Sequence, residues 1–409
     1  MDRQDTPHDE MDEHVEVLKP QEMLQQFDKV NVCGAHLAFD DLLAVVVAYK
    51  APMVRYSKLP FRRLVAQHET HITYTPMLLA QEFSRSAIAR DSDFSTNTLE
   101  RGTFWMTPKT NHVPVQEWDP SPERRSADAV SRKTRRGQRR VRGNLVAQFA
   151  ANDAAQLADA AELIKPWVDG IDLNCGCPQK WAYQEGIGCA LLRKPDTVRD
   201  LVRTTKQRLG WDFPVTVKIR VDPDLRQFLF VDRLTNELVT TAIAAGADVL
   251  TIHGRTRHQS SAGHPVNLDS IKFAVQFSKG QIPCVGNGDV FDLEGAEETR
   301  RRCGVNAVMS ARGLLANPAL FSGYDRTPLP TISEFIRIST QVGLIFPLFH
   351  RHVAYMIESH FMRRMDRVFF NGLTSYASVC DYLEDELGVD LLGSEQRIGV
   401  QRAATAKSA

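Results

Sequence analysis

The chain has 409 residues, 43% of them hydrophobic, so it is long enough for a large α/β domain and a smaller second domain. Its 50 basic and 50 acidic residues cancel, which excludes the strongly basic or acidic compositions that by themselves indicate a partner. Seven cysteines without regular spacing do not suggest a disulfide framework. The acidic, polar start does not read as a signal peptide, and the apolar run Leu42–Tyr49 is too short to span a bilayer. We therefore expect an intracellular protein, cytoplasmic or nuclear, with no membrane association.

Eight short apolar segments follow one another, and each has the composition of a buried parallel strand. They are Ala51–Val54, Ile72–Leu78, Leu145–Ala150, Gly170–Asn174, Val215–Arg220, Val249–His253, Ile282–Gly286 and Ala307–Ser310. Amphipathic, helix-like stretches separate the later ones: Ala154–Trp167, Thr197–Leu209, Asp232–Ala245, Leu268–Ser278 and Leu293–Cys303. Eight alternations of strand and helix predict a TIM (β/α)8 barrel.

The predicted barrel occupies residues 46–325, with an insertion at about 96–142 whose composition fits no barrel element. Residues 1–45 lack clear periodicity, so we treat them as an N-terminal extension. Residues 331–391 carry helical patterns without strands between them, which predicts a C-terminal all-helical domain. Its expected helices are Ile332–Phe346, His350–Met365 and Leu373–Leu387. The small and polar residues 392–409 are expected to form a disordered tail.

The predicted strands hold few polar side chains until their last positions. The polar residues at these positions are Gln148, Asn174, Lys218, His253 and Asn287. The carboxyl ends of the strands form one face of a barrel, and this is the face where barrel enzymes place their active sites. The pattern therefore predicts an active site there.

The segment Asp172-Leu-Asn-Cys-Gly-Cys-Pro178 ends one of these strands and leaves the thiol of Cys177 on the following loop. A cysteine in this place can act as a nucleophile, a metal ligand or a proton donor, and it is inert when it only packs in the core. Cys175 lies two residues away, but a single Cys-x-Cys pair without a second ligand pair is a weak zinc signal. We therefore expect no metal and leave the role of the thiol open at this point.

Two charged or titratable residues lie in strands that are otherwise apolar. Lys218 must face an anion or a polarised carbonyl, because an unpaired buried charge is too costly; the alternative is a structural ion pair with a carboxylate. His253 is either part of the site or a core histidine whose ring bonds a backbone carbonyl. Arg255 and Arg257 follow it in a loop, where solvated arginines are ordinary.

Glycine-rich turns end the last two predicted strands, at Asn287-Gly288-Asp289 and at Ala311-Arg312-Gly313. Barrels frequently bind a phosphate at this place, and an arginine adds a bidentate donor. The alternative is that the glycines serve tight turns only. No Gly-x-Gly-x-x-Gly follows the first strand, so the sequence gives no support to a Rossmann dinucleotide site.

Taken in order, these motifs resemble the tRNA-dihydrouridine synthase family, most closely its eukaryotic 20a/20b subgroup. The matching segments are Ala51-Pro-Met-Val-Arg-Tyr-Ser, Gln148-Phe-Ala, Asn174-Cys-Gly-Cys-Pro, Val217-Lys-Ile-Arg, Ile252-His-Gly-Arg-Thr, Gly286-Asn-Gly-Asp and Ala311-Arg-Gly. The resemblance implies a TIM barrel with a helical tRNA-binding domain. It also implies a flavoprotein in which NADPH or NADH reduces FMN, and FMN then reduces the C5–C6 double bond of a uridine.

The resemblance assigns roles residue by residue. Cys177 would protonate C5 of the uracil, and Asn174 would contact the edge of the base. Residues expected to contact FMN are Pro52, Met53, Val54, Gln148, Lys218 and His253, with Asn287, Gly288, Asp289, Ala311 and Arg312 around its phosphate. In this interpretation Lys218 favours negative charge on the reduced ring. Cys175 is expected to be a packing residue only.

RNA also needs contacts away from the base, and basic residues of the helical region are candidates for phosphate contacts. We select Arg363, Arg364 and Arg367 as substrate contacts, and His350, Arg351 and His352 lie nearby. The run Arg124–Arg142 has nine basic residues and one acidic residue, and it is a further, weaker candidate. The sequence leaves the oligomeric state open, with a monomer as the simplest expectation.

Two other functions remain open from the sequence. One is a flavin barrel acting on a free pyrimidine, as dihydroorotate dehydrogenases do, although such an enzyme has no need of the helical domain. The other is an RNA-binding module that has kept the fold without catalysis.

Overall fold

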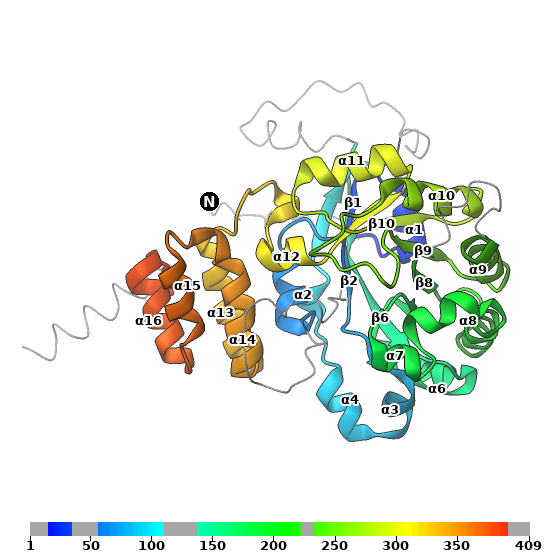
Figure 1. Ribbon diagram of the computed structural model, residues 1–409, viewed down its shortest axis with the longest axis horizontal. Helices are drawn as coiled ribbons and strands as arrows, with labels where there is room; N and C mark the ends of the chain where they lie inside the picture. The colour runs from blue at the N-terminus through cyan, green and yellow to red at the C-terminus, as the bar shows by residue number, and fades with distance from the viewer. Residues whose placement is uncertain (1–14, 35–55, 110–136, 222–232, 392–409) are drawn as a thin grey trace, which may run out of the picture.

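The computed structural model describes residues 15–34, 56–109, 137–221 and 233–391. Within these ranges, eight parallel strands pair side by side and close on themselves through β2 and β6 (Figure 1). They are β1 (Val30–Cys33), β2 (Ile72–Tyr74), β6 (Asn144–Ala150), β7 (Gly170–Cys175), β8 (Val215–Arg220), β9 (Val249–His253), β10 (Cys284–Asn287) and β11 (Ala307–Ser310). The predicted TIM barrel is confirmed.

The first strand differs from the prediction. Ala51–Val54 lies outside the described residues, and Val30–Cys33 pairs with β11 on one side and β2 on the other. The assignment of the whole of residues 1–45 to an extension outside the barrel is therefore wrong. β1 has the sequence Val-Asn-Val-Cys, which is too short to show a clear strand pattern, and no amphipathic helix follows it directly in the sequence. The predicted strand Ile72–Leu78 is split into β2 and a short β3 (Leu78–Leu79) that pairs with the end of β6.

An outer layer of helices surrounds the strands, and the predicted helices recur with small shifts at their ends (Figure 1). The helices of this layer that follow β6 to β11 are α6 (Ala154–Ile164), α7 (Lys180–Gln184), α8 (Pro195–Leu209), α9 (Arg233–Ala244), α10 (Leu268–Ser278), α11 (Leu293–Cys303) and α12 (Arg312–Ala316). Side-chain caps fix several starts: Asp153, Asn267 and Asp292 each accept a hydrogen bond from a backbone N–H three residues on. The outward-facing residues of the barrel strands and the inward-facing residues of the surrounding helices form one continuous apolar core.

The barrel interior is divided into an apolar lower half and a polar upper half. Inward residues of the lower half, such as Val30, Ile72 and Val146, form a separate apolar cluster with α1 (Pro20–Gln26), which closes the amino-terminal end of the barrel. Further along the same strands the inward residues become polar. The site therefore lies at the carboxyl ends of the strands, as the sequence predicts.

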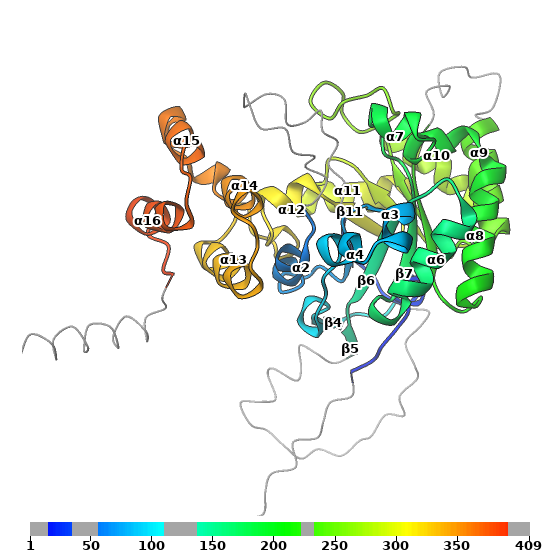
Figure 2. The ribbon, with the colours of Figure 1, turned by 90° about the horizontal axis from the view of Figure 1, so that it is seen from below.

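The insertion is partly described and lies at the closed end of the barrel. β4 (Thr103–Met106) and β5 (Arg139–Arg142) form an antiparallel ribbon there (Figure 2). Arg139 pairs with Glu16, and Arg142 lies 2.5 Å from a carboxylate oxygen of Asp169. These two arginines of the basic run are thus engaged by carboxylates at the end of the barrel opposite the polar site.

The C-terminal region is helical, as predicted, with α13 (Leu329–Val342), α14 (Phe346–Met356), α15 (Arg364–Asn371) and α16 (Tyr376–Leu387). The predicted helix His350–Met365 was wrong in its extent, because α14 ends at Met356 and α15 begins anew at Arg364. The helices lie to one side of the barrel and meet it at α2 (Leu59–Val65) (Figure 1). His352 of α14 stacks on Phe61 of α2 with ring centroids 4.9 Å apart.

A buried ion pair holds α2 to the start of the insertion. Arg62 and Glu100 are 1% and 0% exposed, and the guanidinium Nε of Arg62 donates to the Glu100 carboxylate. Two further guanidinium nitrogens donate to the carbonyls of Ser57 and Ser95, each at 2.6 Å.

We predict that Arg62→Met lowers the free energy of unfolding by about 3–5 kcal/mol, because Glu100 is left as a buried charge without its cation. The double variant Arg62→Met/Glu100→Gln should recover most of that loss. Urea denaturation of the three proteins measures both changes. A single variant as stable as the parent would show that the pair does not bear on stability.

Candidate active site

The strand register brings the predicted polar residues into one ring around the barrel mouth. Gln148 of β6 is the register partner of Asp172 of β7, and Asn174 is the partner of Lys218 of β8. On the other side, His253 of β9 is the partner of both Arg220 and Asn287. All of these residues except His253 are buried, with exposures of 7% or less. Pro52, Met53 and Val54 lie outside the described residues.

A chain of hydrogen bonds runs from Asp172 to the loop that carries Cys177. One Asp172 oxygen accepts from Gln148 Nε2 at 2.8 Å, and the other accepts from Thr216 Oγ1 at 2.5 Å. Gln148 Oε1 then accepts from Asn174 Nδ2 at 2.8 Å. Asn174 Oδ1 in turn accepts from the backbone N–H of Cys177 at 2.9 Å. The carboxylate can only accept, so it fixes which end of each amide points which way.

Asp172 itself was not selected from the sequence as a site residue. It occupies an inward position two residues before Asn174, on the same face of the strand, and an acidic residue in an apolar strand is the signal that marks it. Burial raises the pKa of Asp172 to about 6, against the hydrogen bonds from Thr216 and Gln148 and the charge of Lys218, which lower it. The group is thus a carboxylate at neutral pH, held ionised by its neighbours.

Lys218 is buried among charged and polar groups at the same level. Burial and the charge of Arg220 lower its pKa to about 8, while the charge of Asp172 opposes this shift. Lys218 therefore carries its proton at neutral pH and loses it in mildly alkaline solution. The carboxylate whose charge acts on Lys218 is that of Asp172, and the two predicted roles of Lys218, facing an anion and pairing with a carboxylate, both stay predictions.

Cys177 lies two residues beyond β7 and has no exposed surface. It packs in a small apolar cluster with Met77, Ala150, Ala182 and Ile187. Burial raises the pKa of its thiol to about 11, and a backbone N–H of Gln179 and the charges of Arg220 and Lys218 only partly offset this. The thiol is therefore protonated at neutral pH, which suits a proton donor better than a thiolate nucleophile.

The neighbouring cysteines have different surroundings. Cys175 points into the apolar layer between strands and helices, in agreement with a packing role. Gly188 contacts Cys177 from the next turn, and a Cβ at Gly188 would lie 2.7 Å from the Cys177 Cβ. Among the described residues, no three His, Cys, Asp or Glu side chains are grouped so that they could hold a metal ion.

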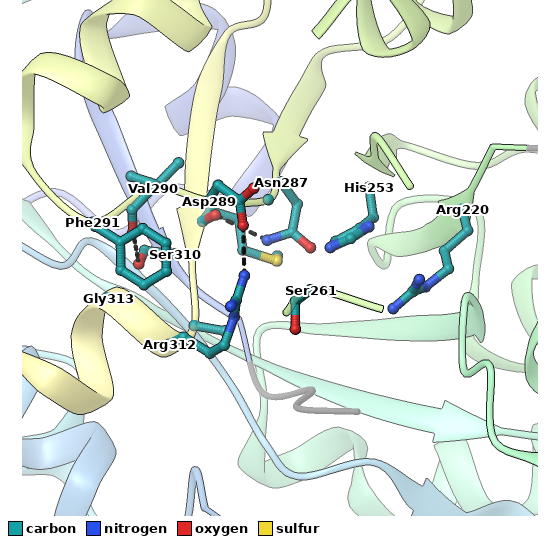
Figure 3. Close-up of a pocket in the computed structure, with 13 residues that line it drawn as sticks. Arg220, His253, Ser261, Asn287, Asp289, Val290, Phe291, Ser310, Arg312 and Gly313 are labelled. Atoms are coloured by element: carbon teal, nitrogen blue, oxygen red, sulfur yellow. Dashed lines mark hydrogen bonds and ion pairs between the residues drawn. The ribbon is translucent and has the colours of Figure 1, made fainter. Parts of the chain in front are cut away.

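A pocket opens beside this ring, at the ends of β10 and β11 (Figure 3). Its polar lining includes Arg220, His253, Ser261, Asn287 and Arg312, and its backbone lining includes Gly288, Ala311 and Gly313. Gly288 has φ +124°, and a Cβ at Gly313 would lie 2.2 Å from the carbonyl oxygen of Val290, so these turns require glycine. We call this the first pocket.

Asp289 organises the first pocket through its carboxylate. Its two oxygens lie 2.5 Å from Arg255 Nη2 and 2.5 Å from Arg312 Nη2, and one oxygen also accepts from the N–H of Val266 at 2.8 Å. Burial alone would raise the pKa of Asp289, but these hydrogen bonds and charges outweigh it and lower the pKa. The carboxylate thus positions two guanidinium groups rather than facing an anion itself.

Two polar atoms beside the first pocket are buried without a hydrogen-bond partner among the described residues: Arg255 Nη1 and Ser261 Oγ. Arg255 is 1% exposed, so the interpretation of this residue as a solvated arginine is wrong. Ser261 lines the pocket directly. Unpartnered donors of this kind, together with Arg312 and Arg220, fit an anionic group such as a phosphate ester.

The helical region does not contribute to this ring. Arg363, Arg364 and Arg367 lie at the start of α15; Arg363 lies 3.7 Å from Asp366, and Arg367 pairs with Glu358. Arg363 and Arg364 are exposed. His352 is buried against Phe61 and Phe335, so its candidacy as an RNA contact was wrong.

The chain is similar to known proteins over most of its length. A family model described as "Dihydrouridine synthase (Dus)" matches residues 49–381. This chain belongs to the dihydrouridine synthase family. A mouse relative, "tRNA-dihydrouridine(20a/20b) synthase [NAD(P)+]-like", is 41% identical over 346 residues, which cover 84% of this chain and 89% of the relative.

Two further members of the dihydrouridine synthase family show similar coverage. The human relative of the same description is 39% identical over 343 residues, covering 83% of this chain and 90% of its own. "tRNA-dihydrouridine(20a/20b) synthase [NAD(P)+]" of Schizosaccharomyces pombe is 41% identical over 339 residues, covering 83% and 87%. The residues matched by the family model, 49–381, include both the barrel mouth and most of the helical region.

The raised pKa of Asp172 gives a pH-dependent prediction. A folded-state pKa of about 6, above the ordinary value of 3.8, means that the carboxyl group favours folding most when it is protonated, and that this stability is lost as the pH rises through about 6. Relative to Asp172→Asn, the parent should therefore lose about 2 kcal/mol of unfolding free energy between pH 4 and pH 7. Denaturant titrations of both proteins at the two pH values measure it. A difference that stays constant with pH would contradict the assignment.

Proposed function

We propose that this chain is a tRNA-dihydrouridine synthase that reduces the C5–C6 double bond of uridine at positions 20a and 20b of tRNA, with NAD(P)H as the reductant. The observation that carries the proposal is the fixed Asn174–Cys177 loop beside Lys218 and Gln148, in a chain of this family. A free-pyrimidine oxidoreductase and a non-catalytic RNA-binding module are not favoured, because the close relatives are named as tRNA-dihydrouridine synthases.

FMN fits the residues at the barrel mouth. The first pocket offers Arg312, Arg220 and the unpartnered Ser261 Oγ to a phosphate, and Gln148 and Lys218 would contact the edge of the ring system. His253 and Asn287 would lie between the two, and Gly288 and Ala311 would approach the phosphate through their backbone. When bound, FMN takes a hydride from NAD(P)H and delivers it to C6 of the uracil.

Cys177 supplies the proton that completes the reduction. As the hydride reaches C6, the electron pair of the C5–C6 bond takes the proton from Cys177 Sγ, so a C5–H bond forms and the S–H bond breaks. The thiolate that remains is then reprotonated from solvent. The pKa of about 11 keeps the thiol protonated before each turnover, so it is ready to act as the acid.

The substrate has to reach a thiol that is closed off in this structure. Cys177 is 0% exposed, and Asn174 holds the backbone of its loop from below. The target base must leave its stack to enter the barrel mouth. Arg363 and Arg364 at the start of α15 are exposed and are proposed to contact RNA phosphates, with Arg367 beside them.

We predict that Cys177→Ala retains bound flavin but loses about 10²–10⁴-fold in the rate of dihydrouridine formation, the usual contribution of a general acid. Visible absorbance gives the flavin content, and mass spectrometry of digested tRNA gives the product. Cys175→Ala is the matched control and should keep most of the rate, because Cys175 faces the apolar layer. Full activity of Cys177→Ala would refute the role of Cys177.

We predict that Lys218→Met slows flavin reduction by NAD(P)H and removes its dependence on pH near 8. In the parent, the ammonium is charged below the pKa of about 8, so the reduction rate should fall as the pH rises through that value. Stopped-flow reduction from pH 6.5 to 9.5 measures the profile. An unchanged rate and an unchanged profile in the variant would show that Lys218 does not act on the cofactor.

A further inference from the structure

A second pocket lies next to the catalytic loop and has no part in the site described so far. Its walls come from α7, from the turn η5 (Gly188–Arg193), from the end of β8 and from the loop after β9. It is lined by Tyr183, Cys189, Leu192, Arg193, Val221, Arg257 and His258. Among these described lining residues, three side chains are basic, one is aromatic and none is a carboxylate.

Arg257, one of the basic side chains that line this pocket, is held in place by an aromatic ring. The guanidinium carbon of Arg257 lies 3.6 Å from the centroid of the Tyr183 ring, which is the stacked cation–π arrangement. Stacking fixes the plane of the guanidinium while its N–H groups stay at the edge, where they can donate to an anion.

The two loops that wall the pocket are joined by Arg220. Its Nε donates to the carbonyl of Gly176 at 3.1 Å, and its Nη1 donates to the carbonyl of Thr256 at 2.9 Å. Arg220 therefore holds the loop after β7 and the loop after β9 together. The second pocket is preformed, and Arg220 also lines the first pocket on its other side.

The second pocket is also tied to the catalytic thiol. The backbone N–H of Cys189, which lines the pocket, donates to the carbonyl of Cys177 at 2.9 Å. A ligand in the second pocket would thus contact Cys189, whose backbone is hydrogen-bonded to the backbone of Cys177.

We propose that the second pocket binds a phosphate ester of one of the two substrates, the RNA or the nicotinamide dinucleotide, through Arg257 with Arg193 and His258. The inference rests on the proposed function, because both substrates of that reaction carry phosphate esters and both must approach the same barrel mouth. A planar, stacked guanidinium with two further basic groups beside it is a donor set that recognises phosphate. The first pocket, at the ends of β10 and β11, remains for the phosphate of the cofactor.

The test compares Arg257→Gln, which removes the charge but keeps a similar stem, with Arg208→Gln. Arg208 is an exposed arginine of α8 that pairs with Asp159 and Glu162, away from the barrel mouth. Arg257→Lys is a further variant that keeps the charge and loses the planar stack. Flavin content and urea denaturation verify that each variant is folded, and neither should change.

Two measurements separate the sources of the phosphate. The first is equilibrium binding of unmodified tRNA over a range of salt concentrations, and the second is the KM for NADPH and for NADH in flavin reduction without tRNA. If the RNA occupies the pocket, Arg257→Gln weakens tRNA binding about tenfold and reduces the salt slope by about one. If the dinucleotide occupies the pocket, Arg257→Gln instead raises a KM about tenfold. Only the KM for NADPH rises when the pocket binds its 2′-phosphate, and the KM values for NADPH and NADH both rise when the pocket binds the pyrophosphate.

Either result supports the proposal. The affected quantity, tRNA affinity or KM, should have a value for Arg257→Lys between those of Arg257→Gln and the parent. Unchanged tRNA binding and unchanged KM values in Arg257→Gln would overturn it, as would an equal effect of Arg208→Gln. Neither measurement depends on product formation. A parent protein that binds both substrates but forms no dihydrouridine would refute the proposed function and leave the result on this pocket standing.

Discussion

The carboxylate of Asp172, buried inside the barrel, is the constraint on which the polar end of the molecule depends. Moving a carboxylate out of water costs several kcal/mol, and two hydrogen bonds and the nearby charge of Lys218 offset only part of that cost. In return, the carboxylate removes the ambiguity of two amide side chains. Gln148 must point its N–H groups toward Asp172 and its oxygen toward Asn174, and Asn174 must then turn its oxygen to the loop of Cys177.

This orientation prepares the barrel mouth for catalysis before any ligand arrives. One connected set of hydrogen bonds and charges fixes three parts of the site. They are the loop that carries Cys177, the Gln148 side chain that would meet the cofactor, and the buried ammonium of Lys218. Such preorganisation is worth more inside a protein than in water, because no reorganisation is needed during the reaction. Arg220 extends the same principle to the loops, since it joins the loop after β7 to the loop after β9.

Much of the fold follows from the sequence because barrel strands are buried on both faces. The segments Leu145–Ala150 and Val215–Arg220 are buried along their whole length and carry regularly placed apolar residues, and their boundaries match β6 and β8 closely. Val30–Cys33 was missed because a four-residue segment that includes the polar Asn31, with no amphipathic helix after it, does not stand out, although pairing with β11 and β2 makes it a barrel strand. The break between α14 and α15 was missed for a similar reason, since the local periodicity continues across it.

Part of the site was predictable because polar residues stand out in strands that are otherwise buried and apolar. Polar residues at the ends of apolar strands identified Gln148, Asn174, Lys218, His253 and Asn287, and the register brings them together. Asp172 and Arg255 were not selected, because their roles depend on partners far away in sequence. Asp172 acts through Gln148 and Thr216 of neighbouring strands, and Arg255 through Asp289. The burial of Cys177 was equally invisible, since it depends on packing with residues such as Met77 and Ile187.

The most direct test of this account is to incubate the purified protein with unmodified tRNA and NAD(P)H and to map dihydrouridine by position. Free uracil and orotate, tested in parallel, separate a tRNA enzyme from one that acts on a free pyrimidine. The account predicts dihydrouridine at positions 20a and 20b of the tRNA and no reduction of the free bases. Reduction of a free base with unmodified tRNA left intact, or no dihydrouridine at any position, would contradict it.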